Sequence, residues 1–440
     1  MKKTLILAIP MFFVFMATNA QEVTYEEYKL DNGLHVILHQ DNSAPVVTTA
    51  VMYHVGAKDE NPEKTGFAHF FEHLLFEETK NIENGEWSKI VSSRGGQGNA
   101  NTTQDRTYYY ETFPSNNLEL GLWLESERLM HPIINQEGVD TQSEVVREER
   151  RQSIDNAPYG RWQEQMFKKL FTNHPYRWTT IGSMEHLANA SLEDFKGFNQ
   201  KFYVPNNAVL TVAGDIDIPE TKKLIKDYFG PIPKGGPVER ATYAEDPIQG
   251  PIKTTFNDSN IQIPAILLGY RTPAQTEREA YVLDMISTYL SDGKSSRLYK
   301  KLVDDQKQAV QVFAFNVSQE DYGAYVVGGL PVGETPLKEI TAEIDEEILK
   351  IQTELISEKD HQKLLNKFEN SFVNSNSSIA GIAGSLATYY MLFDDTSLIN
   401  NQIDIYRSIS REEIKEVANK YLQTSQRVEL EYLPEEPVQN

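Results

Sequence analysis

Apolar and polar positions separate onto two sides of a helix in residues 66–76, which read GFAHFFEHLLF. At about 100° per residue, five apolar side chains fall within one half of the circumference and three ionisable side chains fall on the other half. The apolar half consists of Phe67, Phe70, Phe71, Leu74 and Leu75, and the other half of His69, Glu72 and His73. The pattern predicts an amphipathic helix, and the two imidazoles on its polar side call for a chemical explanation.

Alternating apolar and polar residues elsewhere predict strands, and longer periodic runs predict helices. In the first half of the chain we expect strands at 34–40, 46–56 and 106–113 and a helix at 118–130. In the second half we expect strands at 265–271 and 323–330 and helices near 281–289 and 337–351. This mixture of strands and helices in each half predicts an α+β fold.

Two segments of the chain, 191–212 and 410–431, align with one another without gaps. Each opens with a capping-box pattern, Ser191 with Asp194 and Ser410 with Glu413, and continues as an amphipathic helix into a β-rich stretch. The separation of the two segments is close to half of the chain, so the sequence predicts two copies of one α+β unit.

Residues 230–251 contain four glycines and five prolines with little periodicity, as in a linker. We therefore expect an N-terminal domain at 21–230, a linker at 231–251 and a homologous C-terminal domain at 252–440.

The first twenty residues have the order of a secretory signal peptide. Lys2 and Lys3 precede an apolar run at 5–16, and small residues follow up to Ala20, after which we expect cleavage. Because the apolar run is interrupted by Pro10, it is too short for a membrane span, the alternative interpretation. We expect a secreted protein, in bacteria a periplasmic one.

Composition narrows the chemistry that the chain can perform. It contains no cysteine, which excludes disulfides, Cys nucleophiles and thiolate metal sites. Its formal net charge of −22 argues against nucleic acid or anionic lipid as a partner. Metal chemistry in this chain must therefore use histidines and carboxylates.

The spacing of His69 and His73 predicts a metal site, since residues four apart on a helix project from successive turns. Hydrolytic zinc takes three protein ligands and keeps a fourth position for water, and a nearby carboxylate can move the proton of that water. Glu72 is the candidate general base. The alternative is a helix whose histidines only form hydrogen bonds in a cleft, although burying three ionisable groups without a cation would be costly.

The third ligand is expected in residues 143–153, SEVVREERRQS. If Val145 and Val146 set the buried direction of a helix, Glu149 lies within about 10° of it and Glu148 about 110° away. We therefore expect Glu149 to bind one Zn²⁺ with the two histidines, and Glu148 to pair with a neighbouring arginine or solvent.

The HFFEH motif at 69–73, followed by Glu149 further along the chain, resembles the inverted zinc motif of the pitrilysin and insulinase superfamily. The resemblance is greatest to its two-domain branch, which includes the catalytic subunit of mitochondrial processing peptidase. It extends over YKLDNGLHVILHQ, GQGNANTTQDRTYYYETFP, PNNAVLTVAGDID and GKSSRLYKKLV, in that order along the chain.

The resemblance implies a zinc endopeptidase in which His69, His73 and Glu149 bind the metal and Glu72 activates water. It also implies two homologous α/β-sandwich domains, each a mostly antiparallel sheet backed by helices, around a cleft that admits unfolded peptides. Asn99 and Ala100 would lie on an edge strand that pairs with the substrate backbone. The alternative for Asn99 and Ala100 is a simple turn.

Two positions in the second half depart from the family pattern. Where self-sufficient relatives carry an Arg and a Tyr that hold the substrate, this chain has Val303 and Val310, which cannot donate a hydrogen bond. The resemblance therefore implies a homologous non-catalytic subunit that supplies the missing pair, or a homodimer. A catalytically silent peptide-binding or scaffolding subunit and a zinc hydrolase acting on other bonds remain alternatives.

The other histidines of the chain are scattered. His35 and His39 share the spacing of the motif but lie in LHVILHQ, a predicted strand in which residues four apart are about 13 Å apart. We expect neither to chelate a metal.

Overall fold

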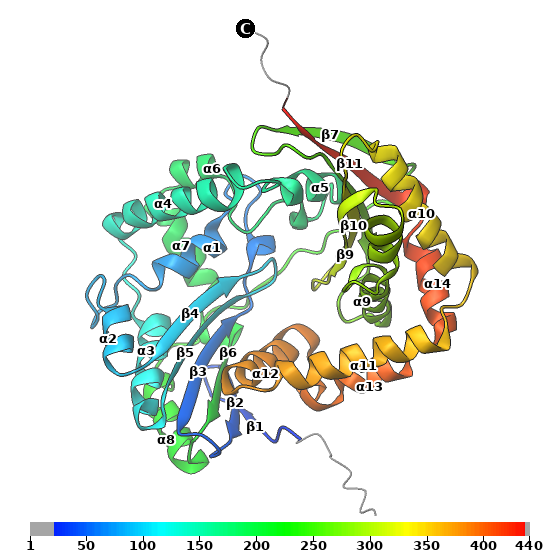
Figure 1. Ribbon diagram of the computed structural model, residues 1–440. Helices are drawn as coiled ribbons and strands as arrows, with labels where there is room; N and C mark the ends of the chain where they lie inside the picture. Colours follow the sequence, from blue (N-terminus) through cyan, green and yellow to red (C-terminus); the bar gives the residue numbers. More distant parts are fainter. Residues whose placement is uncertain (1–21, 436–440) are drawn as a thin grey trace, which may run out of the picture.

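Two β-sheets, one in each half of the chain, form the frame of the structure, a computed structural model that describes residues 22–435 (Figure 1). The first sheet has the order β1-β2-β6-β3-β5-β4, and the second has the order β7-β11-β8-β10-β9. The strands of the first sheet are β1 (Glu26–Lys29), β2 (His35–Gln40), β3 (Val46–Tyr53), β4 (Gln97–Thr102), β5 (Thr107–Pro114) and β6 (Ala208–Gly214). Those of the second are β7 (Ile252–Asp258), β8 (Ala265–Thr272), β9 (Ala309–Val317), β10 (Gly323–Pro331) and β11 (Arg427–Pro434).

The two sheets share one topology apart from the additional edge strand β1. Each contains a single parallel pair, β2 with β6 and β7 with β11, and the remaining neighbours are antiparallel. In this correspondence β4 and β9 are equivalent, and each lies at an edge of its sheet. The structure therefore confirms the α+β class and the duplication.

Helices surround both sheets. Those of the first half are α1 (Phe67–Leu74), α2 (Trp87–Ser93), α3 (Leu118–Met130), α4 (Gln136–Arg150), α5 (Trp162–Leu170), α6 (Met184–Asn189), α7 (Leu192–Phe202) and α8 (Ile218–Phe229). Those of the second are α9 (Arg278–Ser291), α10 (Leu337–Thr353), α11 (Glu358–Ser375), α12 (Ile379–Phe393), α13 (Leu398–Ser408) and α14 (Arg411–Tyr421). Two π-helical turns, η3 (Arg151–Asp155) and η6 (Tyr299–Asp305), precede α5 and β9.

The two halves exchange one helix each. Helix α5 packs on β8 and β11 of the second sheet, and α12 packs on β2, β3 and β6 of the first (Figure 1). Gly269 in β8 leaves room for the Met166 side chain of α5, which a Cβ at this position would displace. Each sheet is therefore covered on one face by helices of its own half and on the other by a helix of the opposite half.

Leu386→Ala tests how much the exchanged helix contributes to stability. The Leu386 side chain is fully buried between α12 and the first sheet, so the substitution should lower the free energy of unfolding by about 2–5 kcal/mol. Urea unfolding followed by circular dichroism measures the difference. Leu349→Ala, at a side chain that is 54% exposed on α10, is the matched control and should change stability little. Equal stabilities of the two variants would contradict the packing described.

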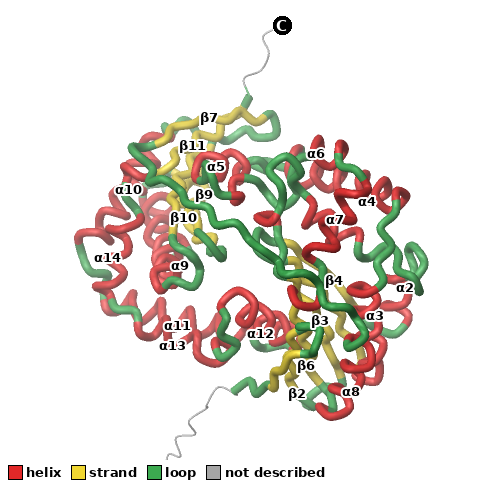
Figure 2. Tube along the Cα trace, turned by 180° about the vertical axis from the view of Figure 1, so that it is seen from behind, coloured by secondary structure: helices red, strands yellow, loops and turns green. Residues whose placement is uncertain are grey.

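Residues 231–251 contain neither helix nor strand, in keeping with the predicted linker. This segment crosses between the two sheets (Figure 2) and is held at Glu245, whose carboxylate accepts the backbone N–H groups of Thr172, Asn173 and His174. Arg271 of β8 also binds Glu245 at 3.1 Å. The linker is therefore fixed to both halves, and the domain boundaries at 21, 230 and 252 stay predictions.

Most of the predicted elements agree with the structure, with one difference in the repeat. Ser191 and Asp194 form the expected capping box at α7. At α14 the Ser410 hydroxyl caps the helix, but the Glu413 carboxylate binds Arg278 at 2.6 Å instead of the Ser410 backbone. In the second copy, an ion pair between two helices therefore takes the place of the expected hydrogen bond from the Ser410 backbone N–H to Glu413. The predicted signal peptide at 1–20 lies outside the described residues.

Candidate metal centre

Helix α1 places its two histidines on one side because its apolar side is firmly anchored. Phe67, Phe70 and Phe71 are buried, and their rings stack against α7, with Phe67 4.6 Å from Phe195 between ring centroids. His69 lies on the opposite side, with its ring centroid 4.9 Å from that of His73. The predicted division of this helix into an apolar and an ionisable side is confirmed.

The beginning of α1 is fixed by Glu60, which sequence analysis did not single out. Its buried carboxylate accepts the N–H of Gly66 at 2.8 Å and that of Ala68 at 2.9 Å. Burial raises the pKa of Glu60 to about 8, although both backbone N–H groups oppose the shift. Gly66 has a φ of +98°, and a Cβ there would also lie 2.7 Å from the carbonyl oxygen of Ile181. Glu60 and Gly66 together set the angle at which α1 enters the site.

Glu149 of α4 faces both histidines of α1. Its Oε1 lies 3.5 Å from His69 Nε2, and its Oε2 lies 3.2 Å from His73 Nε2. Hydrogen bonds with His69 and then His73 hold the pKa of Glu149 well below its usual range. The metal-binding atoms of the three residues all lie within 4.8 Å of one another.

This donor set fits zinc. Bonds of about 2.1 Å in a tetrahedral site place neighbouring ligand atoms about 3.4 Å apart, close to the two distances from Glu149 to the histidines. Two imidazoles and one carboxylate also leave a fourth position for water, as in hydrolytic zinc sites. Among the residues from 22 to 435, this is the group of His and acidic side chains whose geometry could hold a metal ion.

Glu72 lies on α1 between the two histidines, and one of its oxygens is held in place. The hydroxyl of Thr102 donates a hydrogen bond of 2.7 Å to Glu72 Oε2. Thr102 is the last residue of β4, so the carboxylate lies beside the edge of the first sheet. The Thr102 hydroxyl orients Glu72 and leaves its other oxygen for a second partner.

Residues 35–183, which contain all three candidate ligands, match the protein family described as "Insulinase (Peptidase family M16)". Residues 189–368 match the family described as "Peptidase M16 inactive domain". The chain is 32% identical over 409 residues to the zinc protease PqqE of Helicobacter pylori, covering 91% of both chains. The chain belongs to the insulinase family of peptidases, M16.

Solved structures share the fold of this M16 chain. A protease from Helicobacter pylori superposes with a TM-score of 0.89 at 28% identity, over 94% of this chain and 100% of the other. The periplasmic protease PqqL from Escherichia coli superposes with a TM-score of 0.77 at 19% identity. The match covers 94% of this chain but 48% of PqqL, so the M16 chain spans about half of PqqL.

The predicted substrate residues Asn99 and Ala100 lie on β4, which pairs with β5 on one side and is the edge of its sheet on the other. Asn99 is exposed, whereas the Ala100 side chain is buried. The alternative of a simple turn at these residues is wrong, because both are in a strand. Their contact with a substrate stays a prediction.

The predicted direction of α4 requires a correction. Val146 is fully buried, but the Val145 side chain is 44% exposed, so the two valines do not together set the buried direction. Adjacent residues of a helix point about 100° apart, so the narrow contact between α4 and α1 can bury only one of the two valines. Glu149 reaches the histidines because it lies three residues after Val146, while Glu148 binds Arg151 at 3.0 Å, as expected.

Two further imidazoles, those of His35 and His39, are structural. Both residues lie on β2, where His35 Nε2 is 3.0 Å from Glu27 and His39 Nδ1 is 2.7 Å from the carbonyl oxygen of Thr24. Their separate partners agree with the expectation that they do not chelate.

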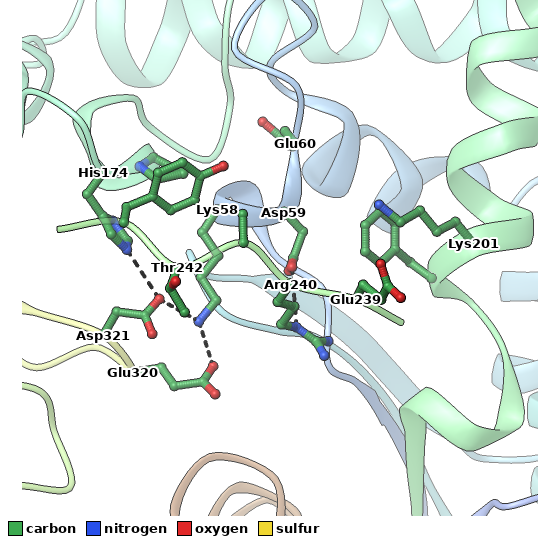
Figure 3. A pocket seen from close by; sticks show the side chains of 14 residues that line it. Lys58, Asp59, Glu60, His174, Lys201, Glu239, Arg240, Thr242, Glu320 and Asp321 are labelled. Carbon is green, nitrogen blue, oxygen red and sulfur yellow. Dashed lines mark hydrogen bonds and ion pairs between the residues drawn. The ribbon is translucent and has the colours of Figure 1, made fainter. Parts of the chain in front are cut away.

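A polar cavity of about 250 Å³ lies where the linker passes between the halves (Figure 3). Lys58 binds Glu320 at 2.7 Å and Asp321 at 3.0 Å, and His174 is 3.2 Å from Asp321. Glu320 and Asp321 belong to the turn between β9 and β10, whereas Lys58 belongs to the first half. These ion pairs join the halves, and the charges in the cavity are largely compensated by one another.

Arg128 supports the end of α1 from within the core. It is fully buried, binds Glu111 at 2.8 Å and Glu125 at 3.2 Å, and donates to the Leu75 carbonyl at 3.1 Å. Burial and then the neighbouring Glu125 raise the pKa of Glu111. Three aromatic rings surround the guanidinium at 4.2–4.5 Å, those of Phe76, Trp87 and Tyr109.

Arg128→Met should lower the free energy of unfolding by about 3–5 kcal/mol, because it leaves two buried carboxylates without their cation. Chemical unfolding of the M16 chain at neutral pH measures the loss. The control is Arg147→Met, at a surface arginine of α4 that pairs with exposed Glu144 and should contribute less than about 1 kcal/mol. A loss no larger than that of the control would show that the buried cluster is not needed.

No helix among the described residues is long and apolar enough to span a membrane.

Proposed function

We propose that this chain is a zinc-dependent endopeptidase that hydrolyses unstructured peptides outside the cytoplasm, as the catalytic member of an assembly. The observation that carries the proposal is the meeting of His69, His73 and Glu149 within 4.8 Å of one another, beside Glu72. Membership of the M16 family supports the reaction class, and the relative named as a zinc protease supports the metal.

His69, His73 and Glu149 would hold the metal ion. When bound, zinc supplies Lewis acidity and lowers the pKa of a coordinated water. Glu72 then acts as the general base that takes a proton from the attacking water and passes it to the leaving amine. The hydrogen bond from Thr102 to Glu72 Oε2 keeps the carboxylate in one orientation during both transfers.

The edge strand β4 is suited to hold an extended peptide. Its outer edge has no neighbouring strand among the described residues, and pairing of a substrate backbone there would be independent of the peptide's side chains. Asn99 and Ala100 are the strand residues to which we assign this contact. Because Thr102 of the same strand binds Glu72, a peptide paired with β4 would lie beside the general base.

A partner would supply what the second half lacks. Val303 packs against the hydrophobic core of the second half, whereas the Val310 side chain is 49% exposed. Neither side chain can donate a hydrogen bond to a peptide. We propose a homologous non-catalytic subunit as the source, with a homodimer as the alternative. The double length of PqqL relative to this chain supports an assembly of two such units.

Export is proposed from the order of residues 1–20, and the periplasmic location named for PqqL supports a periplasmic site. The match of residues 189–368 to the M16 inactive domain leaves a catalytically silent peptide-binding subunit as the second candidate.

Metal analysis together with peptide cleavage tests the proposal. The chain is purified gently, any co-purifying subunit is sequenced, and zinc is measured by mass spectrometry. An unstructured fluorogenic peptide is then incubated with the chain alone and with its partner, with and without chelator. We expect about one zinc per chain and chelator-sensitive cleavage that zinc restores. A metal-free chain that is inactive even beside its partner would favour the peptide-binding subunit.

A further inference from the structure

Arg106 is a half-buried cation in the turn between β4 and β5. Its Nη1 donates a hydrogen bond of 2.8 Å to the carbonyl oxygen of Asn101 and also binds the Asn101 side chain. Among the described residues, no carboxylate forms an ion pair or a hydrogen bond with Arg106. Burial lowers the pKa of Arg106, although Tyr108, Glu72 and Asp105 act in the opposite direction. A cation that has lost much of its hydration gains more from an anionic ligand than a fully hydrated cation does.

The guanidinium of Arg106 reaches the edge strand of the first sheet. Its hydrogen bond crosses from the β5 side to Asn101 of β4, and β4 has no further neighbour among the described strands (Figure 1). A peptide that pairs with this edge would lie about 4.8 Å from β4. Side chains of the peptide on the same face of the sheet would then be within reach of the guanidinium.

The two faces of β4 separate Arg106 from the candidate metal centre. The Thr102 side chain points toward α1, where it binds Glu72. Asn101 precedes Thr102 in the strand, so its side chain points to the opposite face. The guanidinium binds the Asn101 side chain and lies 5.8 Å from the centre of the Tyr108 ring, and it therefore shares this opposite face. Arg106 would meet a side chain or the end of a peptide, and not the carbonyl group that faces the metal.

This face of β4 is open to a ligand. Gln97, Asn99 and Asn101 alternate along it and are exposed, whereas Ala100 on the other face is buried. The three exposed side chains are uncharged amides, so Arg106 supplies the formal charge beside them. Because the formal net charge of the chain is −22, a cation at this place is not part of a generally basic surface.

We propose that Arg106 is a specificity-determining residue that binds a carboxylate of the peptide being cleaved, near the scissile bond. The inference rests on the proposed peptidase function and deepens it by naming a substrate preference. The carboxylate belongs to an Asp or Glu side chain or to the C-terminus of a short peptide, which share one chemistry. A planar guanidinium matches either group with two parallel hydrogen bonds. Thr102, which binds the general base, is adjacent to Asn101, so the selected position lies close to the reaction.

Peptides that differ in one charge test the assignment. A set of unstructured peptides with amidated C-termini carries Glu, Gln or Lys in turn at each position on both sides of the cleaved bond. We expect one position at which Glu is preferred over Gln by about 10- to 100-fold in kcat/KM, the size expected for a charge-assisted hydrogen bond. A second set, with neutral side chains and either a free or an amidated C-terminus, shows whether the terminal carboxylate is the ligand.

Variants of Arg106 separate recognition from general damage. Arg106→Gln should reduce the preference to a few-fold, and Arg106→Lys, which keeps the charge but not the planar fork, should retain part of it. Arg106→Glu should favour the Lys peptide at the same position. The control is Arg407→Gln, which removes the same charge from an exposed arginine of α13 and should preserve the preference. Zinc content and circular dichroism of each variant show that the comparison is made between folded, metal-loaded chains.

Three results would overturn the inference, and all of them leave the peptidase function standing. One is wild-type cleavage with no preference for a carboxylate at any position or at the C-terminus, and another is a preference that Arg106→Gln leaves unchanged. The third is an equal loss of cleavage for all peptides in the folded Arg106→Gln chain, which would make Arg106 a support of Glu72. If the wild type cleaves no peptide, the peptidase function fails, and fluorescence anisotropy with labelled Glu and Gln peptides still measures whether Arg106 favours the carboxylate.

Discussion

Glu72→Gln is expected to lower kcat by about 10²–10⁴-fold while the chain keeps its zinc. Glutamine has the shape of glutamate and can still accept the hydrogen bond from Thr102, so the geometry of the site should persist. Its amide cannot take a proton from water at neutral pH, and the transfer to the leaving amine is lost with it. The substitution therefore removes the general base and little else.

Steady-state cleavage of a fluorogenic peptide and zinc content by mass spectrometry test this expectation together. Glu63→Gln, at an exposed acid just before the same helix, is the control and should behave as wild type. Near-normal turnover of the Glu72→Gln chain would exclude Glu72 as the base. Loss of zinc from this variant would instead place its carboxylate among the metal ligands.

Glu149→Gln is expected to weaken zinc binding by at least about 100-fold and to abolish cleavage at limiting zinc. Changes in groups that only orient metal ligands already cost about 10- to 100-fold, and this change removes a charged ligand itself. The carboxylate lies 3.2–3.5 Å from both imidazoles, so no other part of α4 can replace it without a shift of the helix.

Competition against a chromogenic chelator measures the zinc affinity of the variant. The neighbouring Glu148→Gln is a matched control, since Glu148 is on the same helix and pairs with Arg151 at the surface. We expect Glu148→Gln to retain both zinc and activity. Equal zinc affinities for the two variants would show that Glu149 is not the third ligand.

Local parts of the site could be predicted because one helix determines them. The spacing of His69 and His73 places both rings on one side of α1 whatever surrounds it, and the phenylalanines show which side is buried. Glu149 is distant along the chain, and the direction of its helix was predicted from two adjacent valines, of which Val145 is exposed. Glu149, the acid that the sequence indicated, lies beside both histidines although the predicted buried direction was only half right, and its role as a metal ligand stays a prediction.

Buried charges could not be predicted in the same way. Glu60 and Arg128 occur in stretches whose charged residues are typical of a surface, and only the tertiary structure places them at the two ends of α1. The hydrogen bond from Thr102 to Glu72 could not be predicted either, because it depends on the proximity of β4 to α1. Periodicity shows that a side chain faces inward but not which distant group it meets.

The exchange of helices between the two halves could not be predicted from the sequence either. The apolar side of α12 predicts burial, yet nothing in its pattern states that it covers β3 and β6 rather than its own sheet. The same holds for α5, which covers β8 and β11 of the opposite sheet. The alignment of the segments that begin at Ser191 and Ser410 revealed the repeat but not the exchange between its copies.

The exchange has a consequence for biosynthesis. Strand β6 completes the first sheet at Gly214, but the helix that covers its second face begins only at Ile379, which the ribosome adds much later. An N-terminal fragment ending near the linker would expose an uncovered apolar sheet and should aggregate. Two fragments divided at the linker and produced together in one cell should instead assemble, each completing the other, and the intact chain should melt in one cooperative transition.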